Sequence, residues 1–475
     1  MPMRPSQQQS LTQQLAQAPI PQADQDRKQQ MREAWKAYRG DLQDPLKVKA
    51  NQPNDNVKTN RCAPVVDKGV SFLFGPTLKI ECGDPEQEDA YHAPMQQFVD
   101  GLWGDDDDKM TLLAQAAING GVCGQPFLKL IPAQGAMKYP RIVVLDPLLV
   151  RIVTAPDDCS LTLAYIIEYP GVNDIQKRQI IARVDPDRLA GVAGAYDLDD
   201  TWEITDFERV GGAGAWRQCG ETEVWPYPFA PIFTNQNLPN PNEPWGRPDL
   251  TPDIIEMNKV LNFNESNVSR ILKYHAHPKT WGKGFRHSQV NMGVDDIFII
   301  ESMDGTLQNL EMHSDLKSSL DFIAMLRDSM DEQSRVPAVA LGRMENMVRG
   351  DISGVALQLL FQPLIEKTTQ KQRLYGRTIR EVSRAALVMA GLLPLEQYED
   401  YPVELHWQEL LPIDDLQAAQ TATVYKQLGV STATLLQKLG FDPDDEAEKN
   451  TNEQASMAAQ AQPAQNMPSM SADGE

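Results

Sequence analysis

Cysteine is scarce in this chain of 475 residues, and its five copies stand far apart. They are Cys62, Cys82, Cys123, Cys159 and Cys219. No two of them form a CxxC pair, and an odd count in a chain this long does not fit a secreted disulfide framework. We therefore expect a protein that is made and kept in a reducing cytoplasm.

Long apolar segments are also missing. The longest apolar run, Ala385 to Leu395, is far shorter than the roughly 20 residues that a membrane-spanning helix needs. The N-terminus leads from Met1 into glutamine-rich sequence, without the apolar core of a signal peptide. The sequence therefore predicts no membrane association.

Basic residues are too few to balance the acidic ones. The chain has 44 lysines and arginines against 66 aspartates and glutamates, which gives a formal net charge of −22. A protein that coats DNA neutralises phosphates with a basic face, and this surplus of acid argues against such a protein. An acidic chain can still guide DNA that has to slide past without sticking. The composition alone leaves this interpretation beside that of an ordinary acidic soluble protein.

The chain lacks a phosphate-binding loop. Lys283 follows a glycine, but His277 stands where the motif needs its first glycine and Gly284 where it needs serine or threonine. The glycines at 211, 212 and 214 do not complete a GxGxxG motif, and no serine lies in a GxSxG setting. The sequence therefore predicts no cofactor and no enzyme activity.

Two clusters are weak candidates for metal sites. His275 and His277 have no cysteine or carboxylate cluster beside them, so a histidine pair at a helix end or interface explains them better. The run Asp105–Asp108 is a candidate for a hard cation or a hydrolase site, but four adjacent aspartates cannot converge on one ion. We expect a solvated acidic loop there and no bound metal.

Both ends of the chain differ from its middle. Residues 1–30 hold ten glutamines and no aromatic residue, and residues 443–475 hold no valine, leucine, isoleucine or aromatic residue. Such segments cannot bury enough apolar surface to offset the conformational entropy lost on folding. We expect a disordered N-terminal arm over 1–30 and a disordered tail over 443–475.

Residues 31–250 alternate between short helical and extended patterns. A helix carrying Trp35 and Tyr38 is expected to end at Gly40, and another covers Thr111–Asn119. An apolar element over 65–75 stops at a Gly-Pro pair. Runs rich in β-branched and apolar residues indicate strands over 127–131, 141–145, 149–154, 161–169, 202–207 and 221–226. This pattern predicts an antiparallel α+β platform.

From Thr251 the apolar periodicity becomes helical. Thr251 suits an N-cap and Pro252 suits the first helical position, which predicts a helix over 251–277. Asp304-Gly305 predicts a tight hairpin turn, between strands over 297–300 and 306–312, in a small β insertion.

Two further helices follow, over 315–335 and from Gly354 to about Gly391, with a loop over 336–352 between them. Pro363 lies inside the longer helix, where it removes a hydrogen bond and clashes with the carbonyl of Leu359. We therefore expect this helix to kink at Pro363.

A pair of short helices, Asp414–Leu428 and Thr432–Leu439, is predicted near the C-terminus. The pair imitates a DNA-binding helix-turn-helix. Its second helix offers only Gln437 and Lys438 as readers of DNA, and the acidic residues that follow would repel a duplex. A packed helical hairpin is favoured, and the DNA-binding hairpin stays as the alternative.

Several local sequences, in this order, resemble portal proteins of tailed bacteriophages. They are Asn60–Pro76, Pro241–Leu250, Ser334–Pro337, Ser353–Leu357 and Lys371–Gly376. The resemblance covers roughly residues 30–445 and leaves out the glutamine-rich arm and the acid-rich stretch 81–108. It implies a portal-like α+β fold. Its parts are a wing over 31–250, stem helices over 251–277 and 315–335, a β clip over 278–314, a tunnel loop over 336–352, a long kinked helix with a wing return over 353–411 and a helical crown over 412–442.

The resemblance also implies roles for particular residues. Those expected to line the DNA channel, in the tunnel loop, are Arg343, Met344, Glu345, Asn346, Met347, Val348 and Arg349. Those expected to dock a partner, in the clip, are Ile299, Ile300, Glu301, Asp304, Gly305 and Thr306. The alternatives are that Met344 and Met347 fill the core and that the clip hairpin packs on its own domain.

The implied function is that of a portal ring subunit. The ring is a homo-oligomer, expected to be a dodecamer, which is assembled in the host cytoplasm and sits at the capsid vertex of the virion. The implied partners are double-stranded DNA passing through the channel in packaging and ejection, the terminase motor, capsid and scaffolding proteins, and later the head-completion or tail connector protein. The alternative is a nucleic-acid-binding regulator that uses the C-terminal hairpin.

Overall fold

The computed structural model of the chain describes residues 11–48, 54–75, 77–83, 89–135, 137–184, 201–211, 214–276, 280–283, 306–309, 316–343, 354–408, 410, 423–438 and 449. It divides into two compact units. One consists of Met1–Gly350 with Leu359–Gln408, and the other consists of Asp351–Gln358 with Glu409–Glu475. The first unit holds all the described sheets.

Helices are spread along the whole first unit. Its helices are α1 (Leu11–Gln17), α2 (Gln22–Arg39), α3 (Cys62–Phe74), α4 (Asp89–Trp103), α5 (Asp106–Cys123), α7 (Pro252–Ala276) and α8 (Leu316–Ser334). The long helix α9 (Gly354–Met389) begins in the second unit and lies in the first from Leu359 onwards. Short 3-10 turns occur at Pro147–Leu149, Ala338–Leu341 and Leu395–Gln397.

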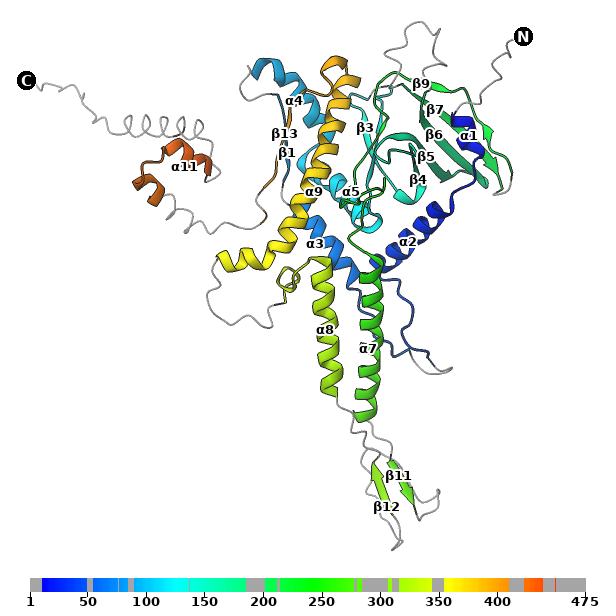
Figure 1. Cartoon of the computed structure of the whole chain (residues 1–475), viewed down its shortest axis with the longest axis vertical. Coiled ribbons are helices and arrows are strands. Elements are labelled where there is room, and N and C mark those ends of the chain that lie inside the picture. The colour runs from blue at the N-terminus through cyan, green and yellow to red at the C-terminus, as the bar shows by residue number, and fades with distance from the viewer. Residues whose placement is uncertain are drawn as a thin grey trace, which may run out of the picture. The chain divides into compact units, whose positions relative to one another are not determined.

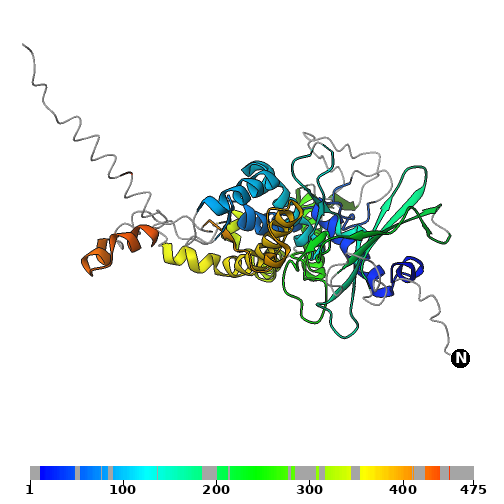
Figure 2. The ribbon, with the colours of Figure 1, turned by 90° about the horizontal axis from the view of Figure 1, so that it is seen from above.

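The largest sheet has six strands in the order β4-β5-β6-β7-β8, with β9 also paired to β7. The strands are β4 (Val150–Thr154), β5 (Thr162–Pro170), β6 (Ile175–Arg183), β7 (Trp202–Val210), β8 (Arg217–Gln218) and β9 (Glu223–Trp225). All these pairings are antiparallel. Figure 2 shows this green sheet with the blue helices α1 and α2 beside it.

Two smaller antiparallel sheets complete the body of the first unit. One has the order β10-β2-β3, and the other pairs β1 with β13. The strands are β1 (Lys79–Cys82), β2 (Phe127–Ile131), β3 (Arg141–Leu145), β10 (Ile232–Thr234) and β13 (Val403–His406). The pairing of β1 with β13 joins the segment that follows α9 to the segment between α3 and α4. The mixed α and antiparallel β class predicted from the sequence is confirmed.

The prediction of a disordered arm over 1–30 was wrong for residues 11–30. Helix α1 lies on the six-stranded sheet, where Ala16 is buried against Ile166, Ile180 and Phe207. Thr12 donates to Glu203 at 2.8 Å, so the short helix is fixed at both its apolar and its polar side. Packing on a preformed apolar face supplies the stability that glutamine-rich composition alone lacks.

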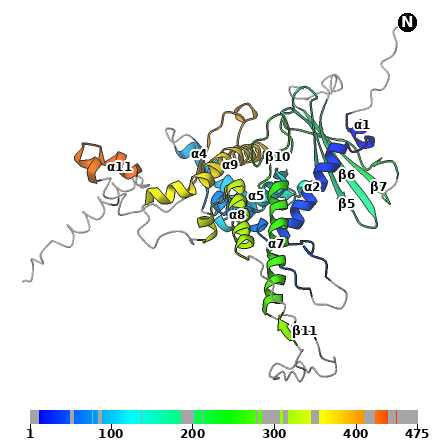
Figure 3. The same cartoon turned by 60° about the horizontal axis from the view of Figure 1, so that its bottom comes forward.

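Helices α7 and α8 lie side by side and antiparallel below the body, as Figures 1 and 3 both show. The predicted start of α7 is confirmed, because the helix begins at Pro252 and the N–H of Ile255 bonds to the carbonyl of Thr251. The predicted second stem helix is confirmed as α8. We call this antiparallel pair the stem.

The strand over 306–312 is confirmed in part. Thr306–Asn309 forms β12, which pairs with β11 (Thr280–Lys283), a strand that the sequence did not predict. The expected partner strand over 297–300 and the turn at Asp304-Gly305 lie outside the described residues.

Helix α9 contains Pro363 in its interior, as expected. Because proline has no N–H, the carbonyl of Leu359 loses its helical partner there. In Figure 1 the ribbon of α9 changes direction within its yellow part.

The second unit contains α11 (Thr432–Lys438) within its described residues. Ser431 caps it, since its hydroxyl accepts from the N–H of Thr434 at 3.3 Å, and Gly429 before it has φ 91°. The helix predicted over Thr432–Leu439 is confirmed over Thr432–Lys438. The earlier part of the predicted first helix, over 414–422, and the tail over 450–475 lie outside the described residues.

Among the helices of the described residues, none combines the length and the apolar content that crossing a membrane requires.

Candidate functional site: the stem and its attachment to the body

A row of polar side chains on α7 holds the segment 54–61, which we call the strap. The side chains of Asn258, Asn262 and Ser266 accept from the backbone N–H groups of Arg61, Thr59 and Val57, at 3.2, 2.9 and 2.9 Å. All three α7 side chains are buried. The spacing explains the fit, because four helical residues rise about 6 Å and two extended residues span nearly the same length.

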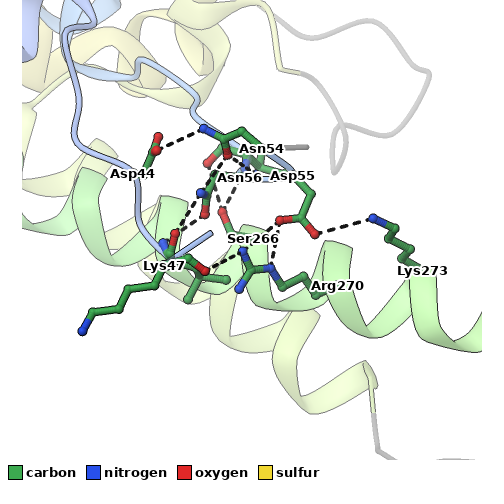
Figure 4. Close-up of polar contacts among 10 residues, drawn as sticks. Asp44, Lys47, Asn54, Asp55, Asn56, Ser266, Arg270 and Lys273 are labelled. Carbon is green, nitrogen blue, oxygen red and sulfur yellow. Dashed lines mark hydrogen bonds and ion pairs between the residues drawn. The ribbon is translucent and has the colours of Figure 1, made fainter. Parts of the chain in front are cut away.

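The strap continues into a loop that folds back on itself. The amide of Asn56 donates to the carbonyl of Leu46, and its oxygen accepts from the N–H of the same residue, both at 2.9 Å. Asp55 then meets two cations of α7, Arg270 at 2.8 Å and Lys273 at 3.7 Å. Figure 4 shows both side chains reaching from α7 to Asp55. The loop is therefore attached to the outer part of the stem by charge as well as by backbone hydrogen bonds.

Glu265 connects the strap to both stem helices. Its carboxylate, on α7, accepts from Arg61 of the strap at 2.6 Å and from Arg327 of α8 at 2.7 Å. Burial raises the pKa of a carboxyl, but here the hydrogen bonds from Arg327 and Arg61 outweigh it and lower the pKa of Glu265. One ionised carboxylate thus bridges three segments and sets the register of α8 against α7.

A buried cluster of three charges lies where the body meets the upper end of α8. Asp249 is paired with Lys367 at 3.0 Å and with Lys371 at 2.5 Å, and the three side chains are 0%, 3% and 2% exposed. Lys367 also donates to the carbonyl of Ser334, the last residue of α8, at 3.0 Å. The negative end of the α8 dipole therefore helps to balance the second lysine.

The charged groups in this cluster shift one another's pKa values. Burial alone would raise the pKa of Asp249, but Lys367 and Lys371 outweigh it and lower the pKa to about 2. Burial lowers the pKa of Lys371 to about 8, against the opposing attraction of Asp249. The aspartate is therefore ionised at neutral pH and holds the lysines within the core.

The same face of α9 carries a further polar contact. Tyr375, one turn after Lys371, donates to the side chain of Asn237 at 3.0 Å. Gly120 of α5 makes room for it, because a Cβ at that position would lie 1.9 Å from the tyrosine hydroxyl. The polar row on α9 thus fastens the loop before the stem as the row on α7 fastens the strap.

Sequence reasoning missed both polar rows. Their members recur every four residues, as 258, 262 and 266 on α7 and as 367, 371 and 375 on α9. The signal was present as polar residues spaced for one helical face. The apolar periodicity alone is enough to predict the helices, and polar residues on a helix are ordinarily expected to face solvent. The two polar rows therefore do not stand out in the sequence.

Of the seven residues predicted for the DNA channel, Arg343 lies within the described residues, and Met344, Glu345, Asn346, Met347, Val348 and Arg349 lie outside them. Arg343 forms an ion pair with Asp331 of α8. Burial raises the pKa of Asp331, and Arg343 opposes this rise. Arg343 therefore begins the loop in a position fixed to the stem.

Of the residues predicted for partner docking, Thr306 is the first residue of β12. Ile299, Ile300, Glu301, Asp304 and Gly305 lie outside the described residues. The docking role of the clip stays a prediction.

The expected acidic loop at Asp105–Asp108 was wrong, because these residues start a helix. Asp105 caps α5 by accepting from the N–H of Asp108 at 2.9 Å, and the next three aspartates form the first turn. Negative charge at a helix N-terminus is stabilising, so the run has a structural explanation. Within the described part of the chain, no group of three or more metal-ligating side chains comes together.

The matched family is described as "Phage portal protein, SPP1 Gp6-like", and the match covers residues 252–466. Over this range the chain is similar to phage portal proteins. The resemblance to portal proteins predicted from the sequence is confirmed. The matched range begins at Pro252, the first residue of α7, and so includes the stem, the clip segment and α9. The phage portal family is structural and non-enzymatic.

Two solved structures are similar to the chain at 12% sequence identity. They are titled "Virion of native gene transfer agent (GTA) particle", with a TM-score of 0.43, and "Neck of empty GTA particle computed with C6 symmetry", with a TM-score of 0.46. Each match covers 80% of this chain and 90% of that chain. No curated protein sequence matches the chain at the significance required.

Proposed function

We propose that this portal protein is the subunit of a ring that forms the channel for DNA packaging into a phage capsid and for its ejection. The observation that carries the proposal is that the portal family match begins where the stem begins. The proposed ring is a dodecamer at the capsid vertex of the virion, assembled in the host cytoplasm. Its proposed partners are duplex DNA, the terminase, capsid and scaffolding proteins, and the head-completion or tail connector protein.

The charge of the chain supports a passive conduit. A channel through which DNA slides needs weak contacts that are evenly spread, and a formal net charge of −22 leaves few groups free to neutralise phosphates. Arg343 fits this requirement, since Asp331 already offsets its charge. The proposed subunit has no catalytic turnover of its own, and the motor that drives the DNA is a separate protein.

Mass and shape of the purified full-length protein test the proposal. Light scattering is expected to give twelve times the chain mass of 53.1 kDa, and negative-stain images are expected to show rings with a central opening. ATPase and nuclease assays on the same sample are expected to stay at background. A monomer or dimer at micromolar concentration, or clear turnover, contradicts the proposal.

The loop over 343–349 is proposed to contact DNA in this channel. Its two arginines, Arg343 and Arg349, would make brief phosphate contacts, each weak because an aqueous channel screens charge. Changing both to glutamate is expected to leave rings intact and to slow packaging in an assay with the cognate motor. Packaging at the normal rate would contradict the proposal that these two arginines contact DNA.

The clip over 278–314 is proposed to dock the terminase and later the tail connector. It is an excursion between the two stem helices, and its described strands form the hairpin-like pair β11 and β12. Replacing 299–308 with a short linker is expected to preserve rings and abolish capture of the terminase. Loss of soluble protein would instead favour a hairpin packed on its own domain.

A further inference from the structure

The two stem helices expose large apolar side chains on opposite flanks. Phe263 of α7 is 46% exposed, and Phe322 and Met325 of α8 are 41% and 55% exposed. Glu265 and Val268 line the groove between the helices, which places Phe263, about half a turn from Glu265, on the side of α7 away from α8.

The far flank of α8 follows from the same geometry. Ile323 is buried in the groove towards α7, so Phe322 and Met325 lie on the other side of α8. Exposed apolar groups gathered on one face of a helix mark an interaction surface more often than an idle one. Within the described residues, the stem therefore has two flanks with exposed apolar side chains, one on each helix.

The charges beside the two flanks have opposite signs. On α7, Lys259 lies one turn before Phe263 and is 55% exposed, whereas Arg270, two turns after it, is already paired with Asp55 of the strap at 2.8 Å. Lys259 pairs with Glu256 of the same helix at 3.1 Å, but both side chains are more than half exposed, and such pairs contribute little. The α7 flank thus carries the exposed ring of Phe263 with an exposed lysine one turn before it.

On α8 the residues beside Phe322 and Met325 are acidic. Asp321, Asp328 and Glu332 are all exposed and lie within one or two turns of Met325. The α8 flank is thus apolar with acidic neighbours. The two flanks of one stem are complementary in charge and alike in apolar character, but they face away from each other and cannot meet within one copy.

The ion pair between Glu265 and Arg327 fixes which residues lie at the same height along the antiparallel stem. Counting from it at about 1.5 Å per residue places Ser329 level with Phe263. The same count places Glu332 within about one residue of Lys259. The exposed lysine on one flank therefore has an acidic group at its own height on the other flank.

We propose that the α8 flank of one copy docks on the α7 flank of the next copy. The proposal rests on the proposed ring, and it adds the surface by which neighbouring copies recognise each other. Rotation about an axis parallel to the stem leaves the position of every residue along that axis unchanged. Residues at the same height on the two flanks therefore face each other in every contact between neighbouring copies. A contact between two different surfaces of the same chain repeats around the axis, and it closes into a ring when the rotation from copy to copy divides a full turn evenly. Phe263 then packs beside Ser329 and Met325 of the neighbour, with Lys259 facing Glu332.

Cysteine cross-linking of the full-length chain tests the contact. The variant Phe263→Cys with Ser329→Cys is expected to give a ladder of covalent oligomers on a non-reducing gel after mild oxidation. The matched control is Phe263→Cys with Ser318→Cys, which moves the second cysteine about 16 Å along the same flank and is expected to give no ladder. Among the native cysteines Cys219 is exposed, so each single variant measures the background.

A charge swap tests the pairing that gives the contact its register. Lys259→Glu is expected to raise the protein concentration needed for half-maximal ring formation by roughly threefold to tenfold, and adding Glu332→Lys is expected to restore it. Rings by light scattering without a Phe263–Ser329 ladder, or without rescue by the swap, would overturn this interface and leave the proposed function standing. A wild-type protein that stays monomeric would overturn the proposed function itself.

Discussion

At Asp249 one carboxylate faces two lysine ammonium groups in a site that solvent does not reach. Removing one partner of such a cluster leaves uncompensated charge in the core, which costs more than the intact cluster contributes. The side chain also lies close to α5, since a Cβ on Gly121 would come within 3.0 Å of its oxygen. Asp249 therefore holds in place Lys367, which bonds to the last carbonyl of α8, and so contributes to the attachment of α8 to the body.

Asp249→Asn is expected to lower the free energy of unfolding by about 3–5 kcal/mol, because Lys367 and Lys371 stay buried without their anion. Denaturant titration followed by tryptophan fluorescence measures it. Glu256→Gln, which removes an exposed acid of α7, serves as the control and is expected to change stability by less than about 0.5 kcal/mol. Equal effects of the two substitutions would show that the buried cluster is not a stabilising anchor.

The same cluster predicts a loss of stability in acid. The pKa of Asp249 is about 2 in the fold against an ordinary 3.8, so the unfolded state takes up a proton first as the pH falls. Its contribution is complete above about pH 4 and is lost as the pH falls through 2, by about 2 kcal/mol. The matched variant is Asp249→Leu, Lys367→Met, Lys371→Met, which keeps the side-chain volume and removes the charges. Its melting temperature is expected to fall less between pH 5 and pH 2 than that of the unchanged protein. An identical acid limb in that variant would assign the loss to other groups.

At the scale of the element, the strap depends on α7 for its backbone hydrogen bonds. Asn262→Ala is expected to destabilise the chain by about 1–3 kcal/mol, because the N–H of Thr59 loses its acceptor in a partly buried site. Hydrogen exchange is expected to speed up over 57–61. Asn264→Ala is the matched control, since that amide donates to Val260 within α7. If hydrogen exchange in the strap is unchanged in the Asn262 variant, the hydrogen bonds from α7 do not hold the strap.

The elements that the sequence predicted best are those in which local preference and packing agree. The strands over 127–131 and 141–145 coincide with β2 and β3, because their alternating apolar residues fit a half-buried sheet. Strand β6 was missed because its lysine and arginine at 177 and 178 look like a loop. In the fold Arg178 is buried, paired with Glu168 and stacked 4.1 Å over Trp216. A local sequence pattern cannot predict that a charged residue is buried when its partners are far away in the sequence.

Local sequence does not show contacts between distant residues, and this also determines how much of the site could be predicted. The two stem helices follow from periodicity and from Thr251-Pro252, and the resemblance named their role. The contacts that hold the stem join Asn258 to Arg61, and Lys371 to Asp249, across 197 and 122 positions of the chain. Helix α1 was mistaken for part of a disordered arm for a related reason: its stability comes from the sheet that it covers, not from its own residues.

At the scale of the whole molecule, the charge of the chain separates the portal interpretation from the alternative of a DNA-binding regulator. Phosphate contacts by lysine and arginine supply most of the sequence-independent affinity for duplex DNA, and a formal net charge of −22 works against them. The C-terminal hairpin on which the alternative depends has two lysines, Lys426 and Lys438, within 423–438.

We therefore expect the full-length protein to leave a linear duplex of about 200 base pairs unshifted on a gel at about 0.15 M salt, up to micromolar protein. Weak retention at about 0.02 M salt that disappears by about 0.1 M fits a conduit, because a few phosphate contacts give an affinity so low that a moderate rise in salt takes it below detection. The decisive comparison is the variant Gln437→Ala with Lys438→Ala. A shift at about 0.15 M salt that this variant abolishes would establish the hairpin as a DNA reader, since groove contacts survive where screened phosphate contacts do not. A weak low-salt shift that the variant leaves unchanged would place the DNA contact elsewhere on the chain.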